Sequence, residues 1–297
     1  MITLQDWMKA HRGSEQIKLF TGNRGMQKNE HVLSELGEKT LSIDFEDPKF
    51  RHLRKDDDVI AYLKHFRTRG VKKVLLCEPG RIVGHTSLLK KLYDPKAWNI
   101  YVTASSRHII DDIRKHYSDC PVAVYRVMKP FEEKRSTPTL KMLWYQSYIY
   151  DVADCLEAAC MRRFQALFEY YSMHIGEVIS NRRTAKELPI HCNRGCATLI
   201  GDYRKTLEDA YLVEFVECYD VFEGKVVKNN PKVFVTDLEM RNYLSGEDSA
   251  EDRHRQQLNR LYLELRCNYR KVYWPRDEKG YDFMTLSANG EKRFWKL

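Results

Sequence analysis

The sequence predicts an α/β fold in which helices cover a parallel sheet, followed by a mainly helical segment and a second, smaller α/β segment. Three observations support this fold class. Short apolar segments alternate with amphipathic ones over the first 130 residues. Residues 141–178 keep helical spacing without a strong helix breaker, and strand patterns return after residue 211. Parallel strands need crossover connections, and helices usually supply them. With 297 residues, the chain is long enough for two or three small domains.

The alternation in the first part of the chain assigns each element by its period. Strands are expected at 17–21, 40–45, 71–77, 99–103 and 121–127. Helices are expected at 31–36, 57–68, 86–92 and 109–116. Ser105 or Ser106 is the expected cap of the last helix, because a serine hydroxyl accepts from first-turn amides.

The later part of the chain contains two short helical patterns, 182–188 and 196–207, separated by the turn sequence PIHCNRG. Two strand patterns follow, at 211–219 and 232–236. Helix, turn, helix and a two-stranded wing is the outline of a winged helix. Beyond it we expect a helix at 252–266 and strands at 271–274, 281–286 and 292–295.

The composition is ordinary for a globular protein, and the formal charge of +8 permits contact with nucleic acid or another polyanion. No apolar run reaches the length of a transmembrane helix, and the first residues lack a signal-peptide core, so we expect a cytoplasmic protein without membrane contact. The eight cysteines do not have zinc-finger spacing, and we expect reduced structural thiols and no metal site.

The turn after the first predicted strand, GNRGMQKN, resembles a damaged nucleotide-binding loop of the form G-x-x-x-x-G-K-[ST]. Gly22 and Lys28 stand where the motif requires a glycine and a phosphate-binding lysine. Gln27 replaces the second glycine, and Asn29 replaces the hydroxyl residue that holds Mg²⁺. Gly25 lies two positions early, where it could restore part of the turn.

Five successive segments resemble one protein family in their order and in their local amino-acid sequence. They are LSIDFEDPKF (41–50), YDPKAWNIYVTASS (93–106), YRKTLEDAYLVEFVECY (203–219), PKVFVTDLEMRNYL (231–244) and RQQLNRLYLELRCNYRKVYWPRDEKGYDF (255–283). This is the archaeal-type AAA ATPase family, whose members carry a P-loop ATPase, a winged helix and a restriction-endonuclease-like domain of unknown function.

The resemblance implies three domains: a degenerate P-loop ATPase at 1–140, a helical and winged-helix domain at 141–246, and a truncated nuclease-like domain at 247–297. It also implies an altered second half of the ATPase site. Family members end a strand in Asp-Glu, but here Cys77 replaces the aspartate while Glu78 remains, and Ala104 replaces a glycine. A thiol is a poor ligand for Mg²⁺, so we do not expect the metal to bind. ATP binding without metal, through Arg24, Lys28 and the helix N-terminus, stays open.

The nuclease-like segment also departs from the family pattern. Asp282 and Lys296 stand at family positions, but the helix glutamate is missing near residues 257–258 and the second carboxylate is missing before Lys296. Because such nucleases need a cluster of carboxylates to hold metal, the resemblance implies a nuclease remnant without activity.

Basic residues gather around the predicted helix–turn–helix and could contact DNA phosphates. They are Arg182, Arg183, Lys186, Arg194, Arg204 and Lys205. An ordinary solvated face is the competing interpretation.

We therefore interpret the chain as a degenerate AAA-type ATPase that acts as a binding or scaffold module for a protein or nucleic-acid partner. One alternative is an ATP-binding ATPase with an atypical loop that relies on Gly25, Lys28 and Glu78. The second alternative is a DNA-binding winged-helix regulator. The oligomeric state is left open.

Overall fold

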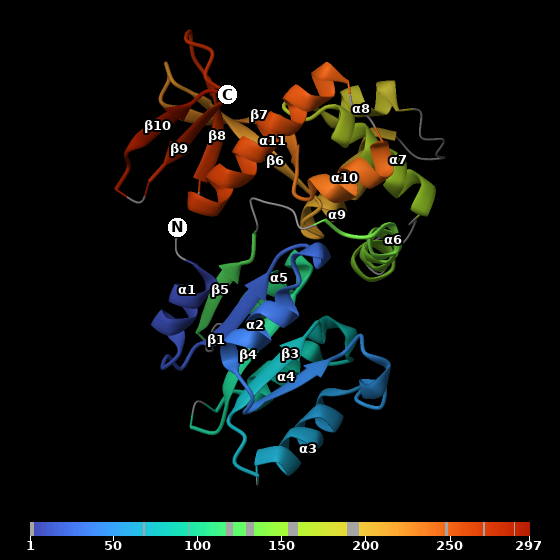
Figure 1. Cartoon of the computed structure of the whole chain (residues 1–297), viewed down its shortest axis with the longest axis vertical. Coiled ribbons are helices and arrows are strands. Elements are labelled where there is room, and N and C mark those ends of the chain that lie inside the picture. Colours follow the sequence, from blue (N-terminus) through green and yellow to red (C-terminus); the bar gives the residue numbers. More distant parts are fainter. Residues whose placement is uncertain are drawn as a thin grey trace. The chain divides into compact units, whose positions relative to one another are not determined.

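The computed structural model describes residues 3–67, 69–94, 96–116, 121–128, 134–153, 160–188, 196–246, 249–269, 271–287 and 289–297. The chain divides into two compact units, Ile2–Val127 and Met128–Leu297, and each has its own hydrophobic core (Figure 1). Within the described part of the chain, no helix has both the length and the apolar character needed to cross a membrane.

A five-stranded parallel sheet forms the centre of the first unit. Its strands are β1 (Ile17–Thr21), β2 (Thr40–Asp44), β3 (Lys73–Cys77), β4 (Asn99–Ala104) and β5 (Val122–Arg126). The order across the sheet is β2-β3-β4-β1-β5, and every neighbouring pair is parallel. The predicted α/β class with a parallel sheet is thereby confirmed. β1 occupies an inner position, with Leu19 in register with both Val102 and Val124.

Helices cover both faces of this sheet. They are α1 (Leu4–His11), α2 (Lys28–Leu36), α3 (Asp56–Arg67), α4 (His85–Leu92) and α5 (Arg107–His116). Short 3₁₀ turns η1 (Arg24–Met26), η2 (Pro48–Phe50) and η3 (Pro79–Arg81) lie in the connections. Residues from α1, α2 and alternate strand positions share one core cluster, and the other strand positions are also buried. Burial on both faces explains the continuous apolar strands.

The predicted elements of this unit are present, with one addition. α1 did not stand out in the sequence because it has only eight residues; it is held by tertiary contacts, since Trp7 packs edge-on against Phe20 with ring centroids 5.3 Å apart. The open choice of cap for α5 is resolved, because Ser106 Oγ accepts from His108 N at 3.3 Å while Ser105 makes other contacts.

The second unit starts with helices and ends with a mixed sheet. Its helical elements are α6 (Thr137–Gln146), the π-helix η4 (Ser147–Ala153), α7 (Met161–Met173), α8 (Asn181–Glu187), α9 (Cys196–Asp209), α10 (Leu238–Ser245) and α11 (Ala250–Asn268). The expectation of nearly unbroken helix over 141–178 is wrong, because Cys160 is extended and α7 begins after it, at Met161. α6 passes directly into η4, and residues 154–159 lie outside the described part of the chain. Trp144 stacks on Phe164 at 4.6 Å, and this packing requires the chain to turn back.

The five strands of the second unit belong to one sheet. They are β6 (Val213–Asp220), β7 (Lys225–Val235), β8 (Lys271–Arg276), β9 (Phe283–Leu286) and β10 (Lys292–Trp295), in the order β10-β9-β8-β6-β7. β8 pairs parallel to β6, and the remaining pairs are antiparallel. The winged helix, the nuclease-like remnant and the domain limits 1–140, 141–246 and 247–297 stay predictions.

A buried ion pair joins α10 to α11. The side chains of Arg241 and Asp252 are both 0% exposed; Arg241 Nη1 donates to Asp252 Oδ2 at 2.9 Å, and its Nη2 donates to the other oxygen. Gln256 Nε2 donates to the same carboxylate at 2.8 Å. Buried charges are tolerated when they are paired and hydrogen-bonded in this way.

Replacing only the cation should therefore be costly. We expect Arg241→Met to lower the free energy of unfolding by about 3–5 kcal/mol, because the Asp252 carboxylate stays buried without its partner. The double variant Arg241→Met/Asp252→Leu should recover at least half of that loss. Urea denaturation followed by circular dichroism measures both; equal losses in the single and double variants would contradict this explanation.

Candidate functional site

The carboxyl ends of three parallel strands bring the candidate nucleotide-binding residues to one edge of the first sheet. β1 leads into the loop from Gly22 to Asn29, β3 ends beside Glu78, and β4 ends beside Ser105. Glu78 N donates to Thr103 O at 3.0 Å, which ties the ends of β3 and β4 together. Ligands of open α/β sheets bind at this type of edge, so the sequence-predicted residues meet where a ligand site is expected.

The loop depends on a glycine at its start. Gly22 has a φ of 151°, and a Cβ at this position would lie 2.5 Å from the backbone oxygen of Val127. At the end of the loop, Gln27 adopts the left-handed conformation with φ 48° and ψ 42°. Gly25 does not supply this turn, because it lies within η1. The left-handed residue is the one directly before α2, and Gln27 occupies that place despite its side chain.

Lys28 is buried at 4% exposure and is held by internal acceptors. Its Nζ donates to Asn23 O at 3.1 Å and to Ser105 Oγ at 2.8 Å. Ser105 in turn donates through Oγ to Glu78 Oε1 at 2.6 Å and through N to Glu78 Oε2 at 3.1 Å. The lysine and the glutamate are thus linked through one serine, and both carboxylate oxygens of Glu78 accept hydrogen bonds.

Asn29 is fixed in a second group of contacts. Its Oδ1 accepts from Thr103 Oγ1 at 2.6 Å, and its Nδ2 donates to Asp44 Oδ2 at 3.3 Å. Asp44 Oδ1 also accepts from Glu46 N at 3.0 Å, and burial raises the pKa of the Asp44 carboxyl. The asparagine therefore joins α2 to β2 and β4 at the position where the motif has a hydroxyl.

Arg24 is bound by a carboxylate from the end of β2. Its Nη1 and Nη2 donate to the two oxygens of Glu46 at 2.6 and 3.0 Å, and Arg81 Nε lies 3.3 Å from Glu46 Oε1. The Arg24 side chain is only 6% exposed. Burial raises the pKa of Glu46, while Arg24 opposes that shift. A bidentate pair of this kind fixes the geometry of both partners.

These residues do not fit Mg²⁺. Burial raises the pKa of the Cys77 thiol to about 12, so the sulfur is protonated at neutral pH. Neutral thiols are unsuitable ligands for a hard cation, and the side-chain oxygen of Asn29 already accepts from Thr103. Among the residues that the structure describes, no group of three or more His, Cys, Asp or Glu side chains could hold a metal ion.

The basic residues of α8 and α9 differ in their surroundings. Arg183 bonds Glu177 and Glu187, each at 2.9 Å, and Arg204 lies 3.5 Å from the centre of the Phe215 ring. The exposed ones are Arg182, Lys186 and Lys205. Arg194 lies outside the described residues. The assignment of this group to nucleic acid stays a prediction.

The two residues of the nuclease-like segment lie at the end of the chain. Asp282 Oδ2 accepts from Leu297 N at 2.8 Å, and Asp282 N donates to Trp295 O at 2.9 Å. Lys296 is exposed. The carboxylate of Asp282 therefore stabilises the backbone beside β10, and its role as a nuclease remnant stays a prediction.

Sequence reasoning missed several residues that complete the carboxyl edge of the first sheet. They are Asn23, Asp44, Glu46, Arg81, Thr103 and Ser105. A usable signal was present, because polar residues that follow parallel strands collect at one edge of the sheet. The pairing of Arg24 with Glu46 had no such signal, since 22 residues separate them and only the sheet order brings them together.

A family model described as "Domain of unknown function (DUF8612)" matches residues 126–251, less than half of the chain. None of the curated proteins compared matches it. Among solved structures, the chain is similar to the Aeropyrum pernix ORC1 protein in complex with DNA, with 12% identity, 78% of this chain and 87% of that chain covered, and a TM-score of 0.28.

A second similar structure is Drosophila ORC bound to AT-rich DNA and Cdc6. It has 8% identity and a TM-score of 0.28, over 82% of this chain and 89% of that chain.

The left-handed Gln27 gives a direct test of the loop geometry. Its side chain is exposed, so substitutions change little packing. We expect Gln27→Gly to be more stable than Gln27→Ala by about 0.5–1 kcal/mol, because glycine adopts positive φ without steric cost. Thermal and urea unfolding of both variants measure the difference. Equal stabilities would show that this residue is not strained.

Proposed function

We propose that this chain is a catalytically degenerate relative of the AAA-family ATPases that acts as a binding or scaffold module. One observation carries the proposal: the side chains of Lys28, Asn29 and Glu78 are all engaged in hydrogen bonds within the sheet edge. In an active site these positions would bind phosphate, hold Mg²⁺ and polarise water. Here their contacts join strand ends, so the inherited positions stabilise the fold.

The chemistry of Cys77 supports this proposal. Cys77 supplies a buried, protonated thiol where an aspartate would support Mg²⁺. Both carboxylate oxygens of Glu78 accept hydrogen bonds from Ser105, which ties the carboxylate to the end of β4. Without a bound metal, hydrolysis loses one of its main contributions.

A protein partner is consistent with the surface of the second unit. Met142, Tyr145 and Ile149 are spaced by three and four residues and are 52%, 47% and 49% exposed. Large apolar side chains exposed together are typical of interaction sites.

Calorimetric titration with ATP, with and without Mg²⁺, tests the proposal. We expect no Mg²⁺-dependent heat at millimolar ATP and no phosphate release, because the residues do not form a metal site. Micromolar binding that requires Mg²⁺, together with turnover that Lys28→Ala abolishes, would instead establish the active ATPase with an atypical loop. Binding of equal affinity with and without Mg²⁺ would support the scaffold with retained nucleotide binding.

The exposed basic residues of α8 and α9 favour DNA binding as a second candidate function. If duplex DNA binds there, its affinity should fall steeply with salt and should weaken at least tenfold when Arg182, Lys186 and Lys205 are all changed to Gln. Fluorescence anisotropy with labelled duplex measures this. Lys279→Gln is the matched control, at an exposed lysine outside α8 and α9. Affinity that ignores both salt and the triple change would exclude this function.

A further inference from the structure

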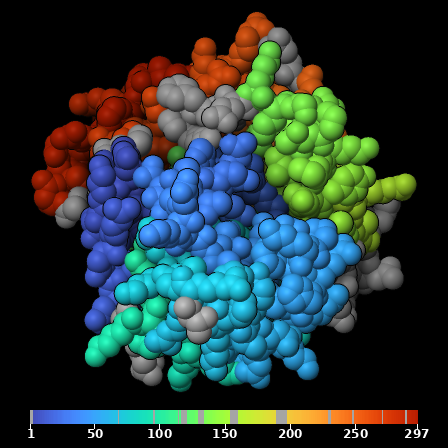
Figure 2. Space-filling view, turned by 60° about the horizontal axis from the view of Figure 1, so that its bottom comes forward, coloured from blue at the N-terminus to red at the C-terminus, as the bar shows by residue number. Residues whose placement is uncertain are grey.

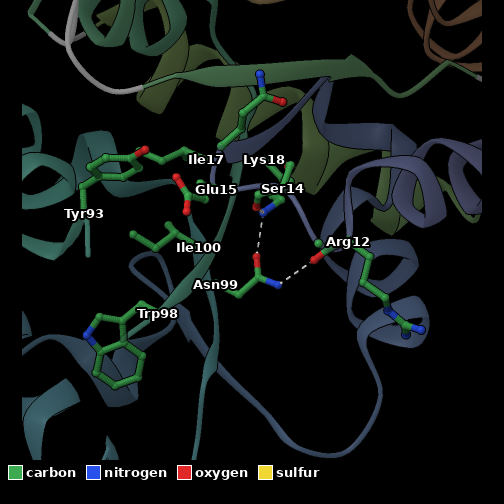
Figure 3. Close-up of a pocket in the computed structure, with 11 residues that line it drawn as sticks. Arg12, Ser14, Glu15, Ile17, Lys18, Tyr93, Trp98, Asn99 and Ile100 are labelled. Atoms are coloured by element: carbon green, nitrogen blue, oxygen red, sulfur yellow. Dashed lines mark hydrogen bonds between the residues drawn. The ribbon is translucent and has the colours of Figure 1, made fainter. Parts of the chain in front are cut away.

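A hollow lies at the amino-terminal edge of the first sheet, opposite the edge that holds the loop from Gly22 to Asn29. It has a volume of about 120 Å³ and is lined by the segment 12–18, by the starts of β1 and β4, and by Tyr93 and Trp98 (Figure 3). β1 begins at Ile17 and β4 begins at Asn99, which places the hollow at the start of these parallel strands. None of the contacts proposed for a nucleotide involves its lining.

The buried cation of this hollow is Lys18, which is 2% exposed. Its Nζ donates to Ser14 O at 2.5 Å and to Asn99 Oδ1 at 2.8 Å, and it lies 5.6 Å from the centre of the Tyr101 ring. Both acceptors are neutral, and no carboxylate of the described residues pairs with this ammonium group. An ammonium group has three protons, so these two bonds leave one for another acceptor.

The position of Asn99 fixes this arrangement. Its Nδ2 donates to Arg12 O at 3.2 Å, so its Oδ1 is presented to Lys18 (Figure 3). A buried charge without a countercharge is unfavourable. Burial accordingly lowers the pKa of Lys18 to about 8.

We propose that this hollow binds a small oxyanion, a carboxylate or phosphate group, that pairs with the Lys18 ammonium. The anion would supply the missing countercharge and accept the remaining proton. A water molecule occupies about 30 Å³ in the liquid, so the volume suits an anion of a few non-hydrogen atoms. The site uses neither Lys28 nor the loop, and it is independent of the proposed scaffold function.

Few other charged or titratable groups of the described residues surround Lys18. Glu15 and Arg12 line the hollow with opposite charges, and both are exposed to solvent, which screens them. The phenols of Tyr93 and Tyr101 also lie close; burial raises the pKa of Tyr101. The lowered pKa of Lys18, about 8, means that this lysine changes its charge between pH 7 and pH 9.

Titration of the full chain with sodium acetate or sodium phosphate, at an ionic strength held constant with sodium chloride, tests the site. Calorimetry or amide NMR shifts give the affinity. We expect saturable binding that Lys18→Met weakens at least tenfold and that the matched control Lys9→Met, at an exposed lysine of α1, leaves unchanged. Binding of both acetate and phosphate would show that the hollow recognises oxyanions in general. Binding of only one would show whether its ligand carries a carboxylate or a phosphate group.

A second variant keeps the test independent of folding. Asn99→Asp keeps the side-chain shape and places a carboxylate 2.8 Å from Lys18 Nζ. It should weaken anion binding at least tenfold, because the lysine gains an internal countercharge, although the hydrogen bond to Arg12 O is lost. The acetate affinity of the unchanged protein should also fall about tenfold from pH 7 to pH 9, as a lysine with a pKa of about 8 loses its proton.

Three results would overturn the proposal. The first is the absence of saturable binding by either probe. The second is an affinity that Asn99→Asp leaves intact. The third is binding that Lys28→Met abolishes while Lys18→Met preserves it, which would place the anion in the loop at the opposite edge and would count toward a retained nucleotide site.

Discussion

The hydrogen bonds from Lys28 through Ser105 to Glu78 organise the carboxyl edge of the first sheet. They join the start of α2 to the ends of β4 and β3, which lie far apart in the sequence. A buried lysine and a buried glutamate would each be unfavourable alone. Their link through one serine offsets their charges, and the neighbouring Asn29 network then fixes α2 against β2 and β4.

This network also explains why strained backbone persists. Gln27 and Glu78 both adopt positive φ, at 48° and 53°, and each such residue costs on the order of 1–3 kcal/mol. Both lie beside residues of the network, so the surrounding contacts hold them in place. The left-handed turn before α2 thus forms at Gln27, although a glycine would adopt this conformation without steric cost.

The buried lysines at the two edges of the first sheet differ in how their charges are paired. Lys28 reaches a carboxylate through Ser105, and the nearby Arg24 is neutralised by Glu46. Among the described residues, Lys18 donates to the neutral oxygens of Ser14 and Asn99. Lys28 and Arg24 thus reach a carboxylate within the chain, whereas no carboxylate of the described residues pairs with Lys18. This difference in charge pairing distinguishes Lys28, which has a structural role, from Lys18, which is suited to an external anion.

The sequence by itself determined the alternation of strands and helices, because residues that face a buried core repeat with the period of their element. It also identified four candidate site residues, because a local motif specifies the residue type at each position. They are Gly22, Lys28, Cys77 and Glu78. Only the tertiary structure decided what these groups contact, since strand order and register set which distant side chains meet. The pairing of Arg24 with Glu46, the turn of the chain between Trp144 and Phe164, and the isolation of Lys18 depend on contacts between segments far apart in sequence, which no local pattern encodes.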